Sequence, residues 1–487
     1  MARTGQVGGV TIWPALNNHI TSIRLARWFA PALAVLLWAV PVLHSVAPTS
    51  LGPHDFSRLV QLGVLLLAAC VWAFMPAAGS NSGESTSRWP IAALGVLVVA
   101  SCLHAAHPLV AAREVALLAG LLLLALQLAR AFSDPAIRDQ FLDLVAVGAA
   151  VYGVMWLLVM LVGAVSAADL FAPWEIIFGF DNARFLNHVQ SMSLPLAGVV
   201  LLRPGTRRWL RAAAAIALVT GGAILTLYLA RASILALLAG ALVTLAVFGR
   251  ASWRYAWTMT LTLGAGALAM GLLWYFWFRY LSEPMTDGIL SPHFRGFLAG
   301  QALDLFATSP WLGVGPMHFT NTVNPIAGHP HDVYVQVLSE YGLPATLLIA
   351  WFAVRFLKRA LENVRRLAST QLVLACALLT ATVALLVDSG FSGNWVMPIS
   401  QMWIAVLIAL LMSLETKAEA SAEALATRRS LPRVAWRALV LSAMVTATSL
   451  ALMEVPDDIP HIHTGEPMKK PIGNQFLSFR FWSYGWF

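Results

Sequence analysis

Charged residues are scarce in this sequence. Of 487 residues, 11% are Asp, Glu, Lys or Arg and 59% are hydrophobic, whereas about a quarter of a soluble globular domain is charged. This composition excludes a soluble domain. The chain also lacks the alternating apolar and polar residues of a membrane β-barrel. Its apolar runs are continuous and of the length, about 20 residues, that a membrane-spanning helix needs, so we predict an all-α polytopic membrane protein.

Several catalytic and targeting signatures are also missing. The three cysteines, Cys70, Cys102 and Cys376, lie far apart inside apolar runs, which indicates small buried residues rather than a disulfide or a metal site. The sequence shows no Gly-rich phosphate loop, nucleophile elbow or kinase motif, and no paired carboxylates on its outer loops. We therefore predict no metal and no cofactor. We also expect no cleaved signal peptide, because no small-residue cleavage site follows the first apolar run.

The apolar runs predict about twelve spanning helices, with a thirteenth, weaker run at 436–453. The twelve are 28–46, 57–75, 90–104, 114–132, 142–166, 185–202, 210–230, 232–248, 255–278, 342–356, 371–389 and 399–414. They divide the chain into a first membrane bundle (1–280), a long polar loop (281–341), the remaining helices (342–454) with a cytoplasmic linker (415–435), and a C-terminal tail (455–487).

The net charge of +8 does not indicate nucleic-acid binding, because the basic residues cluster in short loops between the spans. If the N-terminus is cytoplasmic, nearly all lysines and arginines before the tail fall on the cytoplasmic side. The exceptions are Arg58, Arg113, Arg184, Arg231, Arg279 and Arg295. The excess of Lys and Arg in cytoplasmic loops of membrane proteins therefore predicts that loop 281–341 faces the opposite side, the periplasm of a Gram-negative cell. ATP is absent there, so a bond-forming reaction would need a pre-activated donor.

Loop 281–341 is too long for a simple connection, which indicates a function. Its sequence predicts an amphipathic helix at 298–307, a turn at Gly313-Val-Gly315, and a second helix at 331–341 that ends at Gly342. In the second helix Asp332, Gln336 and Glu340 share one stripe at i, i+4 spacing.

Arginines on the sparsely charged side need partners, and function is the default hypothesis for such residues. Arg184 opens a span, Arg231 lies between two spans joined by almost no loop, and Arg295 lies in the long loop. A guanidinium fork suits phosphate oxygens, so three converging arginines could neutralise a diphosphate. The alternative is snorkelling or pairing with Asp169, Asp181 or Asp388. We favour that alternative for Arg58 and Arg113.

His331 is the candidate general base. An imidazole with a pKa near 6.5 accepts protons at neutral pH, and His329, Asp332, Gln336 and Glu340 lie nearby in sequence as supporting residues. His461 and His463 in the tail form a weak metal signal without a third ligand.

The order of Arg231, Arg295, PWLGVG and His-Pro-His-Asp (329–332), followed by Gln336, Leu338, Glu340 and Gly342, resembles the O-antigen ligase family. Its superfamily includes O-antigen polymerases and protein O-oligosaccharyltransferases. The family pattern commonly has Asn where this chain has Asp332. That difference leaves open whether Asp332 shares in proton chemistry or replaces an amide hydrogen bond.

The resemblance implies a GT-C-type membrane glycosyltransferase in the bacterial inner membrane, with a periplasmic helical loop domain. The implied donor is undecaprenyl-diphosphate-linked O-antigen and the implied acceptor is lipid A-core. Transfer would be en bloc, inverting and metal-independent. The polymerase and the protein-glycosylating enzyme would use the same donor, so the acceptor stays open. A lipid-linked oligosaccharide transporter is the alternative of a different class. It would need arginines across the membrane and would not need His331.

Overall fold

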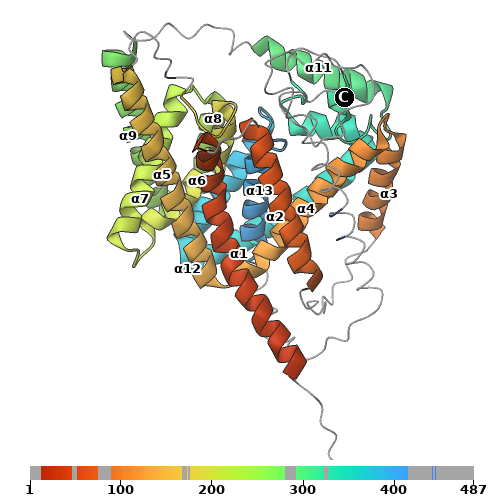
Figure 1. Cartoon of the computed structure of the whole chain (residues 1–487), viewed down its shortest axis with the longest axis horizontal. Coiled ribbons are helices and arrows are strands. Elements are labelled where there is room, and N and C mark those ends of the chain that lie inside the picture. The colour runs from red at the N-terminus through yellow and green to blue at the C-terminus, as the bar shows by residue number, and fades with distance from the viewer. Residues whose placement is uncertain are drawn as a thin grey trace, which may run out of the picture.

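The structure is a computed structural model that describes residues 13–46, 52–74, 89–166, 173, 176–279, 292–322 and 327–414, with 441 and 445. Every regular element in these residues is a helix (Figure 1). The α-helices are α1 (Trp13–Val46), α2 (Pro53–Phe74), α3 (Trp89–His104), α4 (Pro108–Phe132), α5 (Pro135–Ser166), α6 (Ala183–Leu202), α7 (Arg208–Leu227), α8 (Arg231–Phe248), α9 (Trp253–Leu273), α11 (Pro292–Thr308), α12 (Val333–Ser389) and α13 (Pro398–Met412). Short helical turns are η3 (Gly249–Ser252), η4 (Trp274–Phe278) and η6 (His318–Asn321).

The helices fit a polytopic membrane protein. Eight helical stretches in the described residues are long and apolar enough to cross a bilayer, and α3 and α13 are shorter apolar helices. Two of the eight, Arg231–Phe278 and Val333–Ser389, each cover more than one predicted span. The total of about twelve spans and the division into domains stay predictions. The run at 436–453 and the tail histidines lie outside the described residues, apart from 441 and 445.

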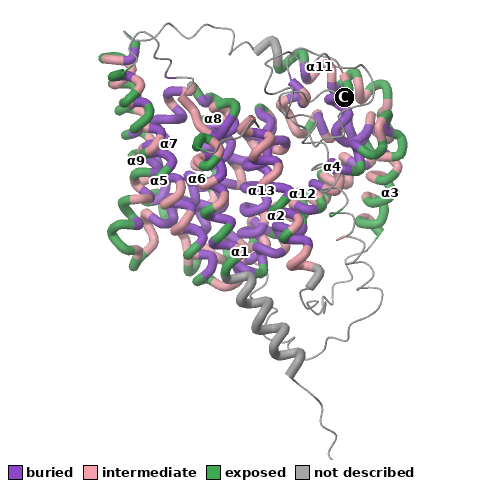
Figure 2. The backbone as a smooth tube through the Cα atoms, in the orientation of Figure 1, coloured by how far each residue is buried: buried purple, intermediate pink, exposed green. Residues whose placement is uncertain are grey.

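Burial separates a central helix from an outer ring (Figure 2). Helix α6 is buried along almost its whole length and packs against α5, α7, α12 and α13. By contrast, α3 and α9 expose large apolar side chains such as Val96, Leu103, Leu261 and Leu268. Exposed apolar surface of this extent indicates contact with another apolar medium, which for this chain is the lipid.

Helix α12 folds back on itself. Its backbone leaves helical geometry at Gly342 (φ 75°) and at Gln371 (φ −138°), which are the first residues of the two spans predicted from the sequence. The Tyr334 hydroxyl near its start donates a hydrogen bond to the Leu386 carbonyl near its end, over 2.8 Å. Gln371 lies at the other end of the bundle, where its amide oxygen accepts a 2.8 Å hydrogen bond from Arg138.

Arg58 joins α2 to α13 inside the protein. Its guanidinium is fully buried and donates to Gln61 Oε1 (2.5 Å), Gln401 Oε1 (2.6 Å) and the Val396 carbonyl (2.6 Å). The sequence predicted a structural role through snorkelling or a helix-end aspartate. These three acceptors are instead amide and backbone oxygens, because the start of α13 brings two of them within reach of α2.

Candidate functional site

The loop that contains PWLGVG docks on the first segment of α12. The amide of Val314 donates to the Ser339 carbonyl (2.9 Å), the amide of Gly315 to the Glu340 carbonyl (3.0 Å), and the amide of Leu343 to the Pro310 carbonyl (2.9 Å). Gly313 and Gly342 both have positive φ, and a Cβ on either would lie 2.5 Å or less from backbone atoms of the other segment. Both glycines are therefore required where two stretches of backbone touch.

Gln336 and Glu340 face this same loop. Glu340 is 1% exposed, and its Oε1 accepts the amide N–H of Phe319 (3.3 Å) while its Oε2 accepts Gln336 Nε2 (3.3 Å). The predicted i, i+4 stripe therefore exists. These contacts position the loop before His331 and indicate an indirect effect on any chemistry at that histidine.

Asp332 caps α12. Its Oδ1 accepts the amide N–H groups of Tyr334 (2.8 Å) and Val335 (3.2 Å), the arrangement of an N-cap residue. An asparagine oxygen could make the same bonds, so the difference from the family pattern is compatible with a shared capping role.

His331 has a left-handed backbone, with φ 57°. Such a conformation is strained for a residue with a side chain and is common at functional sites. Its ring centroid lies 4.2 Å from that of His329. His329 is buried against the turn between α12 and α13, where a Cβ on Gly393 would lie 2.1 Å from its Nε2.

Two of the three predicted arginines, Arg184 and Arg295, lower the pKa of His331. Burial, followed by the positive charges of Arg184 and Arg295 and by the neighbouring His188, lowers the pKa of His331 to about 3. The imidazole is therefore neutral at neutral pH, and the ordinary pKa near 6.5 expected from the sequence does not hold. Arg184 is half-buried on the first turn of α6, and Arg295 is exposed on α11.

Arg231 is placed differently. It is exposed and begins α8, after a turn in which its N–H donates to the Leu229 carbonyl (2.7 Å). Among the described residues, its charge is not one of those that shift the pKa of His331. Its convergence with Arg184 and Arg295 stays a prediction.

The segment before α6 explains how Arg184 is held. Tyr152 and Tyr228 donate to the carbonyls of Phe178 (3.0 Å) and Ile176 (2.5 Å). Asn182 then caps α6 by accepting the Arg184 N–H at 2.9 Å. Because the N-terminus of a helix attracts anions, the backbone and the Arg184 side chain favour negative charge at the same place.

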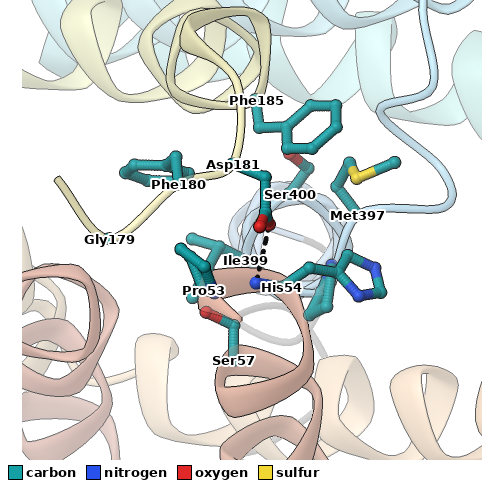
Figure 3. A pocket seen from close by; sticks show the side chains of 11 residues that line it. Pro53, His54, Ser57, Gly179, Phe180, Asp181, Phe185, Met397, Ile399 and Ser400 are labelled. Carbon is teal, nitrogen blue, oxygen red and sulfur yellow. Dashed lines mark hydrogen bonds between the residues drawn. The ribbon is translucent and has the colours of Figure 1, made fainter. Parts of the chain in front are cut away.

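A small pocket lies beside this segment (Figure 3). Asp181 Oδ2 accepts the N–H of His54 across it at 2.7 Å. Its volume of about 10 Å³ is roughly the least that one water needs, so no sugar or diphosphate fits. The hydrogen bond between Asp181 and His54 links the segment before α6 to α2. The partner of Asp181 in this bond is a backbone N–H rather than an arginine side chain.

His188 and Asp388 were not predicted as site residues. His188 Nδ1 lies 3.0 Å from Asp388 Oδ2, both residues are buried, and Asn394 Nδ2 lies 3.4 Å from the same oxygen. His188 is one helical turn after Arg184, and this i, i+4 spacing was the available sequence signal. The sequence suggested Asp388 as a partner of an arginine, whereas its carboxylate contacts His188 and Asn394. The pair lies close enough to His331 for His188 to contribute to the lowering of the His331 pKa.

No three His, Cys, Asp or Glu side chains in the described residues are grouped so that they could hold a metal ion. The three cysteines are free thiols. The features of this site are thus arginine charge, a neutral histidine and a buried histidine–aspartate pair.

Comparison with known proteins agrees with the class of this site. A family model described as O-Antigen ligase matches residues 214–350, which include Arg231, Arg295 and His331 but neither Arg184 nor Asp388. No curated protein matches the chain. The family match supports the O-antigen ligase superfamily, whose members are membrane enzymes of the glycosyltransferase type that act on lipid-linked polysaccharides.

Proposed function

We propose that this protein is an O-antigen ligase. It transfers O-antigen polysaccharide en bloc from undecaprenyl diphosphate to lipid A-core, at the periplasmic side of the bacterial inner membrane. The observation that carries the proposal is that Arg184 and Arg295 lie close enough to His331 for their charges to lower its pKa. Cations that bind a diphosphate and a base that deprotonates a hydroxyl are the two requirements of this transfer.

The donor diphosphate binds between Arg184 and Arg295, at the start of α6, and Arg231 provides a third cation. Charge on the diphosphate increases as it departs. Arginine contacts are therefore strongest in the transition state, where they accelerate the reaction most. Arginine charge in place of a divalent metal makes the reaction metal-independent.

His331 is the general base. The acceptor hydroxyl oxygen attacks the anomeric carbon, the bond from that carbon to the diphosphate oxygen breaks, and the diphosphate leaves with the electron pair. The hydroxyl proton passes to the imidazole, and attack opposite the leaving group inverts the anomeric configuration. In the free protein burial, together with the charges of the two arginines, keeps His331 neutral. A bound diphosphate offsets their charge, so the imidazole becomes a stronger base when the donor is present.

His188 and Asp388 are positioning residues in this scheme. The Asp388 carboxylate fixes one tautomer and one orientation of His188, next to both Arg184 and His331. Their removal would shift the base relative to the donor without removing a group that touches either substrate.

Reconstitution with lipid-linked polysaccharide and purified lipid A-core tests the proposal. A high-mass conjugate on lipid A-core, insensitive to chelator and absent with His331→Ala, is the expected result. A longer lipid-linked polymer would instead identify a polymerase, and a modified protein a protein O-oligosaccharyltransferase. Movement of the donor across the membrane without any conjugate would identify a transporter.

A further inference from the structure

A second polar site lies at the other end of α6. A cavity of about 670 Å³ opens where the start of α5 meets the turn between α6 and α7. Ligand pockets in proteins occupy about 300–1,000 Å³. The first and last residues of α6 separate this cavity from Arg184 by the length of a 20-residue helix, about 30 Å, so it is distinct from the site of His331.

The charged residues that line the cavity balance one another. Asp139 and Asp143 are one helical turn apart on α5, and Arg203 and Arg207 come from the end of α6 and the following turn. Arg203 pairs with Asp139 (3.3 Å) and Asp143 (2.5 Å). Arg207 is exposed, and its charge also acts on Asp143. Asp139 also lies 3.7 Å from the buried Arg138, which does not line the cavity. Its side chain is nevertheless 39% exposed, so one carboxylate and one guanidinium remain accessible.

The surroundings match the level of lipid headgroups. Trp209 lines the cavity and is 57% exposed. Trp253 and Trp257, at the start of α9, are also exposed and stack with their rings 6.1 Å apart. Exposed tryptophans mark the boundary between lipid and water. Basic pockets between spanning helices bind anionic phospholipid headgroups in other membrane proteins, whereas the lining of this cavity has as many acidic as basic residues.

We propose that this cavity binds the headgroup of a zwitterionic phospholipid with a primary ammonium, such as phosphatidylethanolamine. Arg207 binds the phosphate, and Asp139 accepts hydrogen bonds from the ammonium. The balance of two acidic and two basic lining residues favours this ligand over an anionic lipid. A primary ammonium is favoured over a quaternary one because only the former has N–H groups to donate.

Lipid retention measured by native mass spectrometry of the full-length protein tests this assignment. The purified protein is exchanged into detergent with equal amounts of phosphatidylethanolamine, phosphatidylcholine and phosphatidylglycerol. We expect phosphatidylethanolamine to be retained about tenfold over phosphatidylcholine, since charge-assisted hydrogen bonds contribute about 1.5–3 kcal/mol. Asp139→Asn should remove this preference, and Arg207→Gln should lower the retention of all three phospholipids, because each of them carries the phosphate that Arg207 binds. Soluble O-phosphoethanolamine should compete for the site if the headgroup rather than the acyl chains carries recognition.

Arg254→Gln is the matched control, because Arg254 is an exposed arginine at the start of α9 that does not line the cavity. It should retain the wild-type preference. Equal retention of the three lipids, preferential retention of phosphatidylglycerol, an unchanged preference in Asp139→Asn, or undiminished retention of all three lipids in Arg207→Gln would overturn the proposal.

Discussion

His188 and Asp388 are 200 residues apart in the chain and meet through a 3.0 Å contact between Nδ1 and Oδ2. The contact joins α6, which carries Arg184 on its first turn, to the end of α12. His331 lies just before the start of α12, and the His329 ring next to it packs on the turn that follows Asp388. One buried pair therefore connects the elements that carry the proposed phosphate-binding and base residues.

Loss of this pair should slow transfer without removing donor binding. We expect Asp388→Asn to reduce kcat about 100-fold, because misplacing reacting groups by about 1 Å has effects of that size, and to change KM for the donor little. Single-turnover transfer with lipid-linked polysaccharide measures the first effect and donor titration the second. Asp304→Asn, on an exposed carboxylate of α11, is the control, and His188→Gln should give the same pattern as Asp388→Asn. A normal kcat in Asp388→Asn or His188→Gln would mean that the pair does not position the reacting groups.

Alanine at Arg184 or Arg295 should lower kcat/KM for the donor by about 10- to 100-fold, since hydrogen bonds to charged groups contribute about 1.5–3 kcal/mol. Steady-state kinetics with a varied donor would show it. Arg231→Ala tests whether the third arginine also binds the diphosphate. An effect on kcat/KM as small as that of Lys358→Ala would mean that Arg231 does not. Arg58→Ala is unsuitable as a control, because its guanidinium holds α2 and α13 together and its loss would disturb the fold.

The pH dependence should differ between the free and the donor-bound protein. The pKa of His331 is lowered to about 3 in the free protein, so its base form persists down to that pH. We therefore expect kcat/KM to show no acidic limb near pH 6.5 from this residue. The profile of kcat, which reports the bound complex, should fall at a higher pH because the diphosphate offsets the arginine charge. An acidic limb near 6.5 in kcat/KM that His331→Ala removes would contradict the assignment.

The same lowered pKa links His331 to stability. The unfolded chain binds its proton near pH 6.5 and the folded chain only near 3, so acidification through this interval favours unfolding. Urea or thermal unfolding between pH 7 and pH 4 should show a smaller loss of stability for His331→Gln than for the wild type. Equal losses in the two proteins would mean that the histidine is already protonated in the folded state.

Gly342→Ala should destabilise the protein by about 1–3 kcal/mol, the range for a residue with a side chain held in a rare backbone conformation. Its φ is 75°, and a Cβ would lie 2.5 Å from the Trp311 carbonyl oxygen. Thermal unfolding in detergent measures the change. Gly300→Ala, on α11 with open space around it, should be neutral or slightly stabilising. If both substitutions behaved alike, the docking of the 310–322 loop would not depend on Gly342.

Local features of this fold could be predicted from the sequence. Hydropathy located the apolar helices, and Gly342 with Pro344 marked the break that the structure places there. The helix predicted at 298–307 ends at Thr308 in the structure, although it begins earlier than predicted, at Pro292. These predictions held because each depends on a few adjacent residues and on backbone preferences that are independent of tertiary context.

Other features depended on contacts distant in sequence. Nothing near Asp388 shows that His188 will pair with it, since the pairing follows from the way α6 packs on α12. The i, i+4 stripe of Gln336 and Glu340 was visible, but not the loop that it faces. The lowered pKa of His331 was hidden for the same reason, because it arises from burial and from arginines on two other helices.

The return path of α12 brings the segment that follows His331 and the segment that contains Asp388 to the same end of the bundle on one uninterrupted stretch of chain. The stretch begins next to His331 and contacts Arg138 through Gln371 at the far end of the bundle. It then returns to Asp388, whose carboxylate contacts His188. Proteolytic cleavage near Gln371 would therefore break the chain between His331 and Asp388, although the cleaved bond lies at the opposite end of the bundle.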